Sequence, residues 1–319
     1  MDILVIGCGV SGLTTGLCLL EAGYSTHIWA RELPPHTTSN AAAAVWFPFK
    51  AYPLDKVTVW GRESWQKFQE LQPLKESGVV MRTFIEVLPT PAPDPWWVSA
   101  VPDFRHADQA ELPTGYLDGY SCTTPVIDTG VYLDYLVREF TARNGQIVQR
   151  AVTHLAEAFA HAPIVVNCSG LGARELVGDT DIRPAKGQVV RIRPNGFQRV
   201  LVDETGQAGL TYIVPRLHDI VLGGTYEEGN ERADIDPEVR QAILQRCARL
   251  APEFRSVTAA DIISEGCGFR PVRSAVRVEA ERLSTDRLLL HNYGHGGAGI
   301  TLSWGCAREV VELLATTSR

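Results

Sequence analysis

The glycine motif G-x-G-x-x-G near the start of the chain constrains the fold more than any other feature. Gly7, Gly9 and Gly12 follow a β-branched apolar run at residues 3–6, and leucines then recur at helical spacing up to Gly23. In a strand–turn–helix unit, the three glycines permit a tight turn, close approach of a pyrophosphate and close packing of helix on strand. The motif therefore predicts a Rossmann-like α/β domain that binds a dinucleotide.

An acidic residue in the expected place supports this prediction. Such a residue binds the ribose hydroxyls and lies about 20 residues after the motif. Glu32 follows a predicted strand at residues 27–29 and lies 20 residues after Gly12. The first turn of the predicted helix would supply free N–H groups and a partial positive charge to the phosphates.

Composition excludes several other classes of protein. The 319 residues are 45% hydrophobic and 21% charged, which is typical of a globular chain, and the net charge of −7 argues against nucleic-acid or anionic-membrane binding. Seven cysteines without a C-x-x-C pair predict neither a disulfide framework nor a metal site. No apolar run reaches the ~20 residues of a membrane span, and no signal-peptide pattern is present, so we expect a cytoplasmic protein.

Two further glycine-rich segments suggest that two domains are interleaved. One follows an apolar run at residues 164–167, and the other, at 294–299, precedes a helix expected to begin near Thr301. The segments between them are rich in short predicted strands. We therefore expect an FAD-binding α/β domain interleaved with an antiparallel-rich α+β substrate domain. The expected bounds are 1–48, 130–186 and 266–319 for the former, and 49–129 and 187–265 for the latter.

Hydrophobic periodicity predicts the elements of the middle of the chain. Helices are expected at residues 64–71, 130–143 and 237–250, and strands at 79–87, 188–193, 209–215 and 220–225.

FAD fits the pattern better than NAD. A polar stretch followed by small residues, at 36–44, could reach phosphate and then lie against a flat ring. The glycine loop at 294–299, followed by a helix, would place a helix N-terminus near a flavin and stabilise negative charge on it. An NAD-dependent dehydrogenase would leave this loop unexplained.

Two motifs carry the most specific information, Gly-Phe-Arg-Pro-Val-Arg at 268–273 and His-Asn-Tyr-Gly-His-Gly-Gly at 291–297, and Tyr-Ile-Val-Pro at 212–215 accompanies them. Together with the N-terminal glycine motif, they resemble the D-amino-acid oxidase family of flavoproteins, which includes the D-aspartate oxidases. The resemblance covers nearly the whole chain.

The resemblance implies an FAD-dependent oxidative deamination. In this family the Cα hydrogen passes as hydride to flavin N5, and the imino acid hydrolyses to a 2-oxo acid and ammonia. Molecular oxygen then reoxidises the flavin and yields hydrogen peroxide. Apolar residues aligned near the pocket, Val45, Phe47, Phe49 and Val214, favour neutral or hydrophobic D-amino acids. A D-aspartate oxidase, a glycine/sarcosine-type oxidase and a non-catalytic flavin protein are the alternatives.

Residue roles follow from the same resemblance. Arg270 matches the arginine that binds the substrate carboxylate, Tyr212 a tyrosine that donates to it, and Gly297 a glycine whose carbonyl accepts from the substrate amine. The residues expected to contact FAD are Gly7, Gly9, Val10, Ser11, Gly12, Arg31, Glu32, Thr37, Thr38, Ser39, Ala43, Ala44, Val45, Val152, Ser169, Gly170, Arg270, Gly296, Gly297, Ala298, Gly299, Ile300 and Thr301.

The chain departs from the family pattern at two positions. A lid tyrosine of the mammalian oxidases corresponds to Ala208, which predicts a more open entrance, and an arginine of the D-aspartate oxidases corresponds to Tyr226. Lys50 or Arg216 could replace that arginine, although Arg216 is expected on an exposed hairpin turn. A homodimer is kept as an expectation, since the sequence does not fix the oligomeric state.

Overall fold

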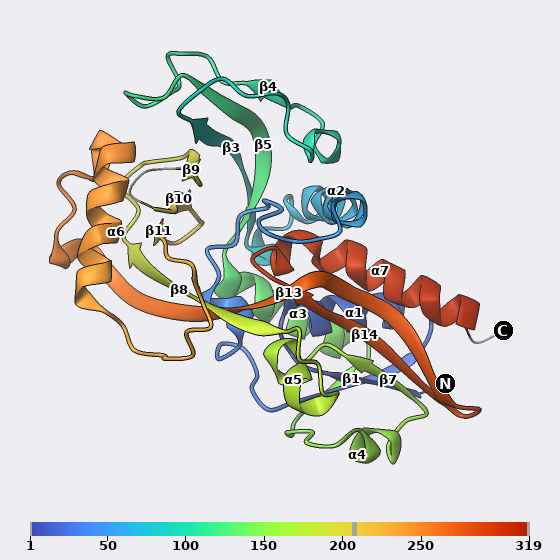
Figure 1. Cartoon of the computed structure of the whole chain (residues 1–319). Coiled ribbons are helices and arrows are strands. Elements are labelled where there is room, and N and C mark those ends of the chain that lie inside the picture. Colours follow the sequence, from blue (N-terminus) through green and yellow to red (C-terminus); the bar gives the residue numbers. More distant parts are fainter. Residues whose placement is uncertain (1, 206–208, 318–319) are drawn as a thin grey trace.

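A computed structural model describes residues 2–205 and 209–317 and contains one mixed sheet of 14 strands (Figure 1). The order along the sheet is β4-β5-β3-β9-β10-β11-β8-β13-β14-β7-β1-β2-β6, and β12 pairs with β8. The strands are β1 (Asp2–Ile6), β2 (Ser25–Ala30), β3 (Val79–Leu88), β4 (Arg105–His106), β5 (Asp118–Ile127), β6 (Gln146–Gln149), β7 (Ile164–Asn167), β8 (Arg183–Ile192), β9 (Val200–Asp203), β10 (Thr211–Pro215), β11 (Ile220–Gly223), β12 (Glu227–Glu228), β13 (Ile262–Ser284) and β14 (Arg287–His295).

One end of the sheet is parallel and covered on both faces. The strands β14, β7, β1, β2 and β6 are neighbours there and run parallel. Ile3 and Val5 face a core that includes α1 and α7, whereas Leu4 and Ile6 face a second cluster that includes α4. The helices of the molecule are α1 (Val10–Glu21), α2 (Leu54–Leu71), α3 (Thr129–Ala142), α4 (Leu155–Phe159), α5 (Ala173–Leu176), α6 (Pro237–Leu250) and α7 (Gly299–Thr317).

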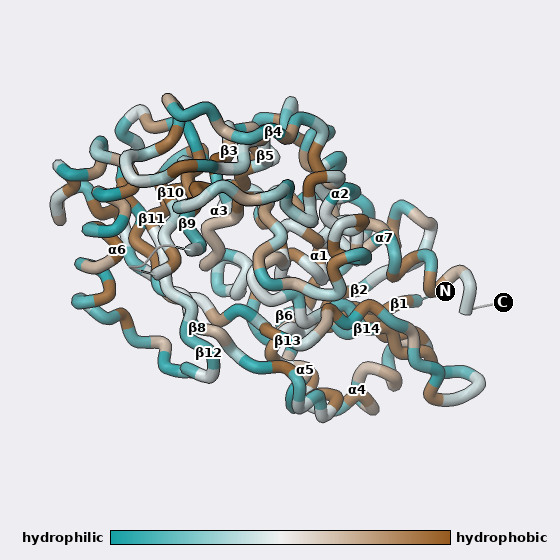
Figure 2. The backbone as a smooth tube through the Cα atoms, turned by 45° about the horizontal axis from the view of Figure 1, so that its top comes forward, coloured by the Kyte–Doolittle hydropathy of each residue, from teal (hydrophilic) through white to brown (hydrophobic). Residues whose placement is uncertain are grey.

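The other end of the sheet is largely antiparallel. Strands β9, β10, β11 and β8 are antiparallel neighbours, and α6 packs over them through Ile243 and Cys247. Figure 2 shows the hydrophobic segments concentrated along the strands and the helix faces of the interior, while much of the outer loop surface is hydrophilic. The mixed sheet and its helices confirm the predicted α/β fold class.

The 23-residue strand β13 was not anticipated from the sequence, and it links the two ends of the sheet. Its first part pairs with β8 and its second part with β14, both antiparallel. Its first part contains Gly266, Gly268 and Pro271, and register shifts interrupt the pairing, so apolar alternation is confined to residues 276–280 and does not mark the whole strand. Hydrogen bonding to β8 and to β14 therefore stabilises β13 where its local sequence does not.

The predicted elements differ mainly in their bounds. The strand at residues 164–167 and the helix at 237–250 are confirmed. The prediction for α2 was wrong at its start, because the helix begins at Leu54, ten residues before the expected position 64. Its first turns pack Val57 and Trp60 against α7, and this tertiary burial outweighs the polar residues between them.

In the part of the chain that the structure describes, no helix is long and apolar enough to cross a membrane. All seven cysteines are free, and six of them are buried.

Candidate functional site

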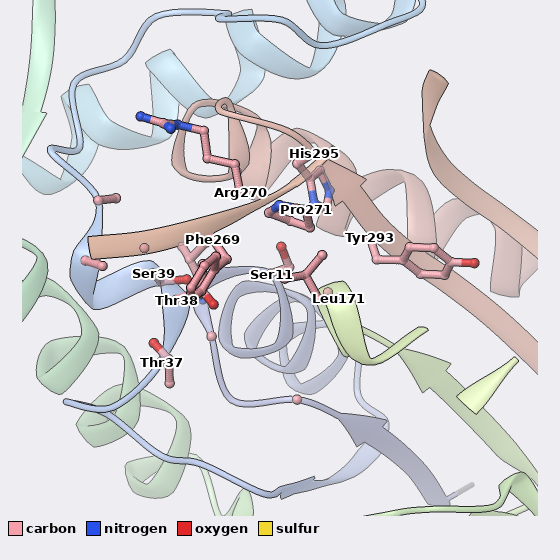
Figure 3. Close-up of a pocket in the computed structure, with 18 of the residues that line it drawn as sticks. Ser11, Thr37, Thr38, Ser39, Leu171, Phe269, Arg270, Pro271, Tyr293 and His295 are labelled. Carbon is pink, nitrogen blue, oxygen red and sulfur yellow. The ribbon is translucent and has the colours of Figure 1, made fainter. Parts of the chain in front are cut away.

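A cavity of about 900 Å³ lies where the glycine-rich turns meet β13 (Figure 3). Most of the predicted site residues line it. They are Gly7, Gly9, Val10, Ser11, Arg31, Glu32, Thr37, Thr38, Ser39, Ala43, Ala44, Val45, Val152, Ser169, Gly170, Tyr212, Arg270, Gly296, Gly297, Gly299 and Ile300. Segments far apart in the sequence therefore converge on one space.

We call one part of this cavity the glycine end: residues 7–11, 31–32, 37–39, 151–153 and 169–170 line it, and Gly12 packs behind the turn. Gly7 has a φ of +113°, and a Cβ there would lie 2.4 Å from the carbonyl oxygen of Cys168. A Cβ on Gly12 would lie 1.9 Å from the carbonyl oxygen of Gly7. Only glycine fits at these two positions, since the backbone of the turn, of α1 and of the segment after β7 are in contact.

Hydroxyl groups surround the N-terminus of α1. The N–H of Val10 donates to Ser39 Oγ at 3.0 Å, and Ser169 Oγ donates to Asn167 Oδ1 at 2.6 Å. The helix N-terminus, with its partial positive charge, thus faces a polar wall. Such a wall is suited to an anion such as a pyrophosphate.

Three of the predicted residues lie outside the cavity lining. Gly12 packs against the turn, and Ala298 and Thr301 are buried in or beside the first turn of α7. The Thr301 hydroxyl donates to the carbonyl of Phe47 at 2.9 Å and accepts from its N–H at 3.1 Å. Thr301 therefore holds the segment around Phe47 in place rather than facing the cavity.

We call the other part the Arg270 end; Phe47, Phe49, Val202, Glu204, Leu210, Tyr212 and Arg270 line it. The Arg270 side chain leaves β13 on the side away from Thr38 and Ser39 (Figure 3). Its guanidinium lies against Gly187, where a Cβ would approach to 2.3 Å, and donates to the carbonyl of Thr225 at 3.0 Å.

The charge of Arg270 has no acidic partner among the described residues. By contrast, Arg273, three positions along the same strand, pairs with Asp179 at 3.0 Å. A half-buried guanidinium that faces a cavity without a counter-ion can bind a carboxylate through two parallel hydrogen bonds. The Arg270 end is thus suited to an anionic group.

Tyr212 and Gly297 complete this end. The Tyr212 ring lies over Gly223 and Gly224, where a Cβ would approach to 2.1 Å and 2.6 Å. Burial raises the pKa of Tyr212, and the positive charge of Arg270 partly offsets this, so the hydroxyl stays a hydrogen-bond donor at neutral pH. Gly297 is exposed to the cavity next to Phe49, whose ring leaves no room for a side chain there.

The expectations for the surrounding residues need two corrections. Val214 is buried in the core and does not line the cavity. Arg216 does lie in the β10–β11 turn, but its side chain is buried: it donates to Asp219 Oδ1 at 2.6 Å and to Thr129 Oγ1 at 2.9 Å. Arg216 is therefore unavailable to a ligand, because its partners lie within the fold. Ala208 lies outside the described residues.

Sequence reasoning missed several titratable residues of the lining, among them Glu204 and His295. His295 is buried and its Nε2 lies 2.9 Å from Asn292 Oδ1. Burial lowers its pKa to about 4, so the imidazole is neutral at pH 7. The repeated histidine and glycine pattern of residues 291–297 could have signalled His295, whereas no local pattern singles out Glu204.

The cavity fits an FAD molecule by the criteria that this structure offers. Glycines whose Cβ positions are filled by neighbouring atoms form a cradle at Gly7 and Gly12, and an acidic residue, Glu32, lines the same end. Small residues, Ala43, Ala44 and Gly296, line the segment between the two ends and leave space for a flat ring.

Comparisons with known proteins agree with this geometry. The family model described as FAD dependent oxidoreductase matches residues 2–313. The chain is 44% identical to a D-amino-acid oxidase of Rubrobacter xylanophilus, over 97% of this chain and 94% of that protein. It is 34% identical to the D-aspartate oxidase of Homo sapiens, over 98% and 94%. The structure of glycine oxidase from Geobacillus kaustophilus superimposes with a TM-score of 0.82 at 18% identity and covers 99% of this chain and 94% of that one.

Proposed function

Because the chain belongs to the family of FAD-dependent oxidoreductases, we propose that it is a flavoenzyme that deaminates neutral and hydrophobic D-amino acids oxidatively. The products are a 2-oxo acid, ammonia and hydrogen peroxide. The relatives named D-amino-acid oxidase, which are 39–44% identical over nearly the whole chain, support this activity. The observation that carries the proposal is the Arg270 guanidinium, which lines the cavity and has no acidic partner among the described residues.

The residues of the Arg270 end would orient the substrate. Arg270 would bind the two carboxylate oxygens, and the Tyr212 hydroxyl would donate to one of them. The carbonyl of Gly297 would accept a hydrogen bond from the α-amino group. Bound FAD supplies the hydride acceptor and passes the electrons on to oxygen, so the protein mainly binds and orients.

Binding of both the carboxylate and the amino group on the α-carbon would make the site select one enantiomer. With the carboxylate at Arg270 and the amine at Gly297, only one enantiomer directs its Cα–H toward the ring, while its side chain lies toward Phe47 and Phe49. No general base among the described residues is needed for hydride transfer once the amine is neutral. The neutral His295 is held by Asn292 and plays no part in this scheme.

D-aspartate oxidation is a weaker alternative. It requires a second cation for the side-chain carboxylate, and Arg216 cannot provide one because Asp219 neutralises it. Lys50 lies outside the cavity lining, with its ammonium 3.7 Å from the centre of the Tyr226 ring. The homodimer and the cytoplasmic location stay predictions from the sequence.

The visible spectrum of the purified protein tests the proposal. We expect flavin absorbance, which neutral D-amino acids such as D-methionine bleach under nitrogen and which returns on admission of air together with hydrogen peroxide. L-Methionine serves as the control and should leave the spectrum unchanged. A yellow protein that no D-amino acid bleaches would be a flavin protein without this activity.

A further inference from the structure

Glu204 is the acidic side chain of the Arg270 end of the cavity. It follows β9 directly, and together with Val202, two residues earlier, it lines the cavity. Val202 pairs with Tyr212 on β10, so β9 runs past the residue expected to bind the substrate carboxylate. Glu204 follows the last residue of β9, Asp203, and so lies beyond the Val202–Tyr212 pair rather than beside Tyr212.

The Glu204 carboxylate has no hydrogen-bond or ion-pair partner within residues 2–205 and 209–317. Its side chain is accessible because it faces the open cavity, yet protein surrounds it closely enough for burial to raise its pKa to about 7. The nearby positive charge of Lys50 acts against this rise. An unpaired carboxylate that faces a cavity is available to a cationic group of a ligand.

The described groups around Glu204 do not pair with its carboxylate. Glu86 lies on β3 beside Val202, and burial raises its pKa to about 8, with Glu204 and Asp203 adding to the rise. Asp203 accepts a hydrogen bond from the Tyr116 hydroxyl at 2.5 Å. Lys50, whose positive charge acts on Glu204, is held over the Tyr226 ring. Ionised Glu204 is therefore available to a positively charged group of a ligand.

The other lining residues of the Arg270 end are largely apolar, and they include Phe47, Phe49 and Leu210. A lysine- or arginine-like side chain has an apolar stem and a charged head, so its stem suits these walls and its head suits Glu204. An acidic side chain would meet a like charge instead.

We propose that Glu204 is a specificity residue that binds the cationic head of D-arginine or D-lysine while Arg270 binds the α-carboxylate. This inference rests on the proposed function and names a substrate class within it. Neutral D-amino acids remain substrates, because they need only the Arg270 contacts and the apolar walls. Glu204 does not touch the reacting Cα–H bond, so its effect lies in binding rather than in the hydride step.

D-Arginine and D-citrulline provide the sharpest test, since they have nearly the same shape and differ in charge. Anaerobic stopped-flow experiments on the holoenzyme at pH 8 give the rate constant of flavin reduction, kred, and the dissociation constant of the substrate, Kd. We expect kred/Kd to be at least about tenfold higher for D-arginine than for D-citrulline, because D-arginine makes one additional charged contact. In Glu204→Gln this ratio should fall toward one through a higher Kd for D-arginine, with the limiting reduction rate nearly unchanged. Glu175→Gln is the matched control, because Glu175 also lines the cavity but lies on α5, away from β9 (Figure 1). The D-arginine to D-citrulline ratio of this variant should equal that of the wild type.

The wild-type protein offers a second test if the Glu204 variant does not fold. The ratio of D-arginine to D-citrulline cancels the titration of the shared α-amino group. It should rise with pH between about 6 and 8 as Glu204 loses its proton. A D-arginine to D-citrulline ratio near one at every pH, or an unchanged ratio in Glu204→Gln, would overturn this inference. If D-methionine were still oxidised in that case, the proposed function would stand. If no D-amino acid bleached the flavin, both would fail.

Discussion

The two ends of the cavity are built in different ways. At the glycine end, backbone atoms of neighbouring residues form the wall, and Gly7 and Gly12 leave no room for side chains. At the Arg270 end, side chains from three strands converge: Glu204 from the end of β9, Tyr212 from β10 and Arg270 from β13. At the glycine end the shape of the turn is set by one short glycine motif, although residues from four other segments complete the wall, whereas the Arg270 end depends mainly on how distant strands pair.

The glycine end should tolerate substitution least. In Gly12→Ala, a Cβ 1.9 Å from the Gly7 carbonyl would force the turn and α1 apart. Overpacking of this kind costs about 1–3 kcal/mol or more, so retained FAD should fall by at least about tenfold. The ratio of flavin to protein absorbance measures this. Gly130→Ala is the control, since its Cβ on α3 meets nothing closer than 3.7 Å and should leave FAD content unchanged.

Tyr212→Phe probes the Arg270 end with a smaller change. The variant keeps the ring over Gly223 and loses the hydroxyl that donates to the substrate carboxylate. A hydrogen bond to a charged group contributes about 1.5–3 kcal/mol, so kcat/KM for D-methionine should fall about 10- to 100-fold while FAD content stays normal. Equal kcat/KM values in variant and wild type would remove Tyr212 from the proposed site.

A further prediction concerns stability and His295, the last residue of β14. His295 has a pKa of about 4 in the folded chain against an ordinary value of 6.5, because burial disfavours its charged form. The unfolded chain therefore binds the proton first, and stability present above pH 6.5 is lost as the pH falls toward 4. The loss amounts to about 3 kcal/mol at most.

Urea unfolding between pH 4 and 7 measures that loss. The midpoint should fall with pH more steeply in the wild type than in His295→Asn, which has no proton to gain there. Parallel curves for the two proteins would show that His295 is not the group responsible.

The same contrast separates the features that could be predicted from the sequence from those that could not. The strand at 164–167, the helix at 237–250 and the glycine motif are local patterns, and each was predicted correctly. The strand β13 and the first half of α2 form through pairing and packing with distant segments, so their local sequences gave no sufficient signal. The division into two domains stays a prediction.

Side-chain surroundings were the hardest to predict. Arg216 and Arg270 are both arginines next to strand residues, and only the fold reveals that Asp219 neutralises the first. Glu204 belongs to no motif, and its place in the cavity depends on the pairing of β9 with β10. Charge partners are set by tertiary structure, and a family resemblance supplies them only where it matches residue by residue.

Arg270→Met tests the central claim most directly, in an anaerobic absorbance titration with D-methionine. We expect the variant to keep its FAD and to need at least about a hundredfold more substrate for half reduction, since removing one member of a charged pair costs several kcal/mol. Arg273→Met, which breaks the ion pair with Asp179 instead, should lower stability but bleach at wild-type concentrations. An Arg270→Met protein that D-methionine bleaches as readily as the wild type would contradict the account.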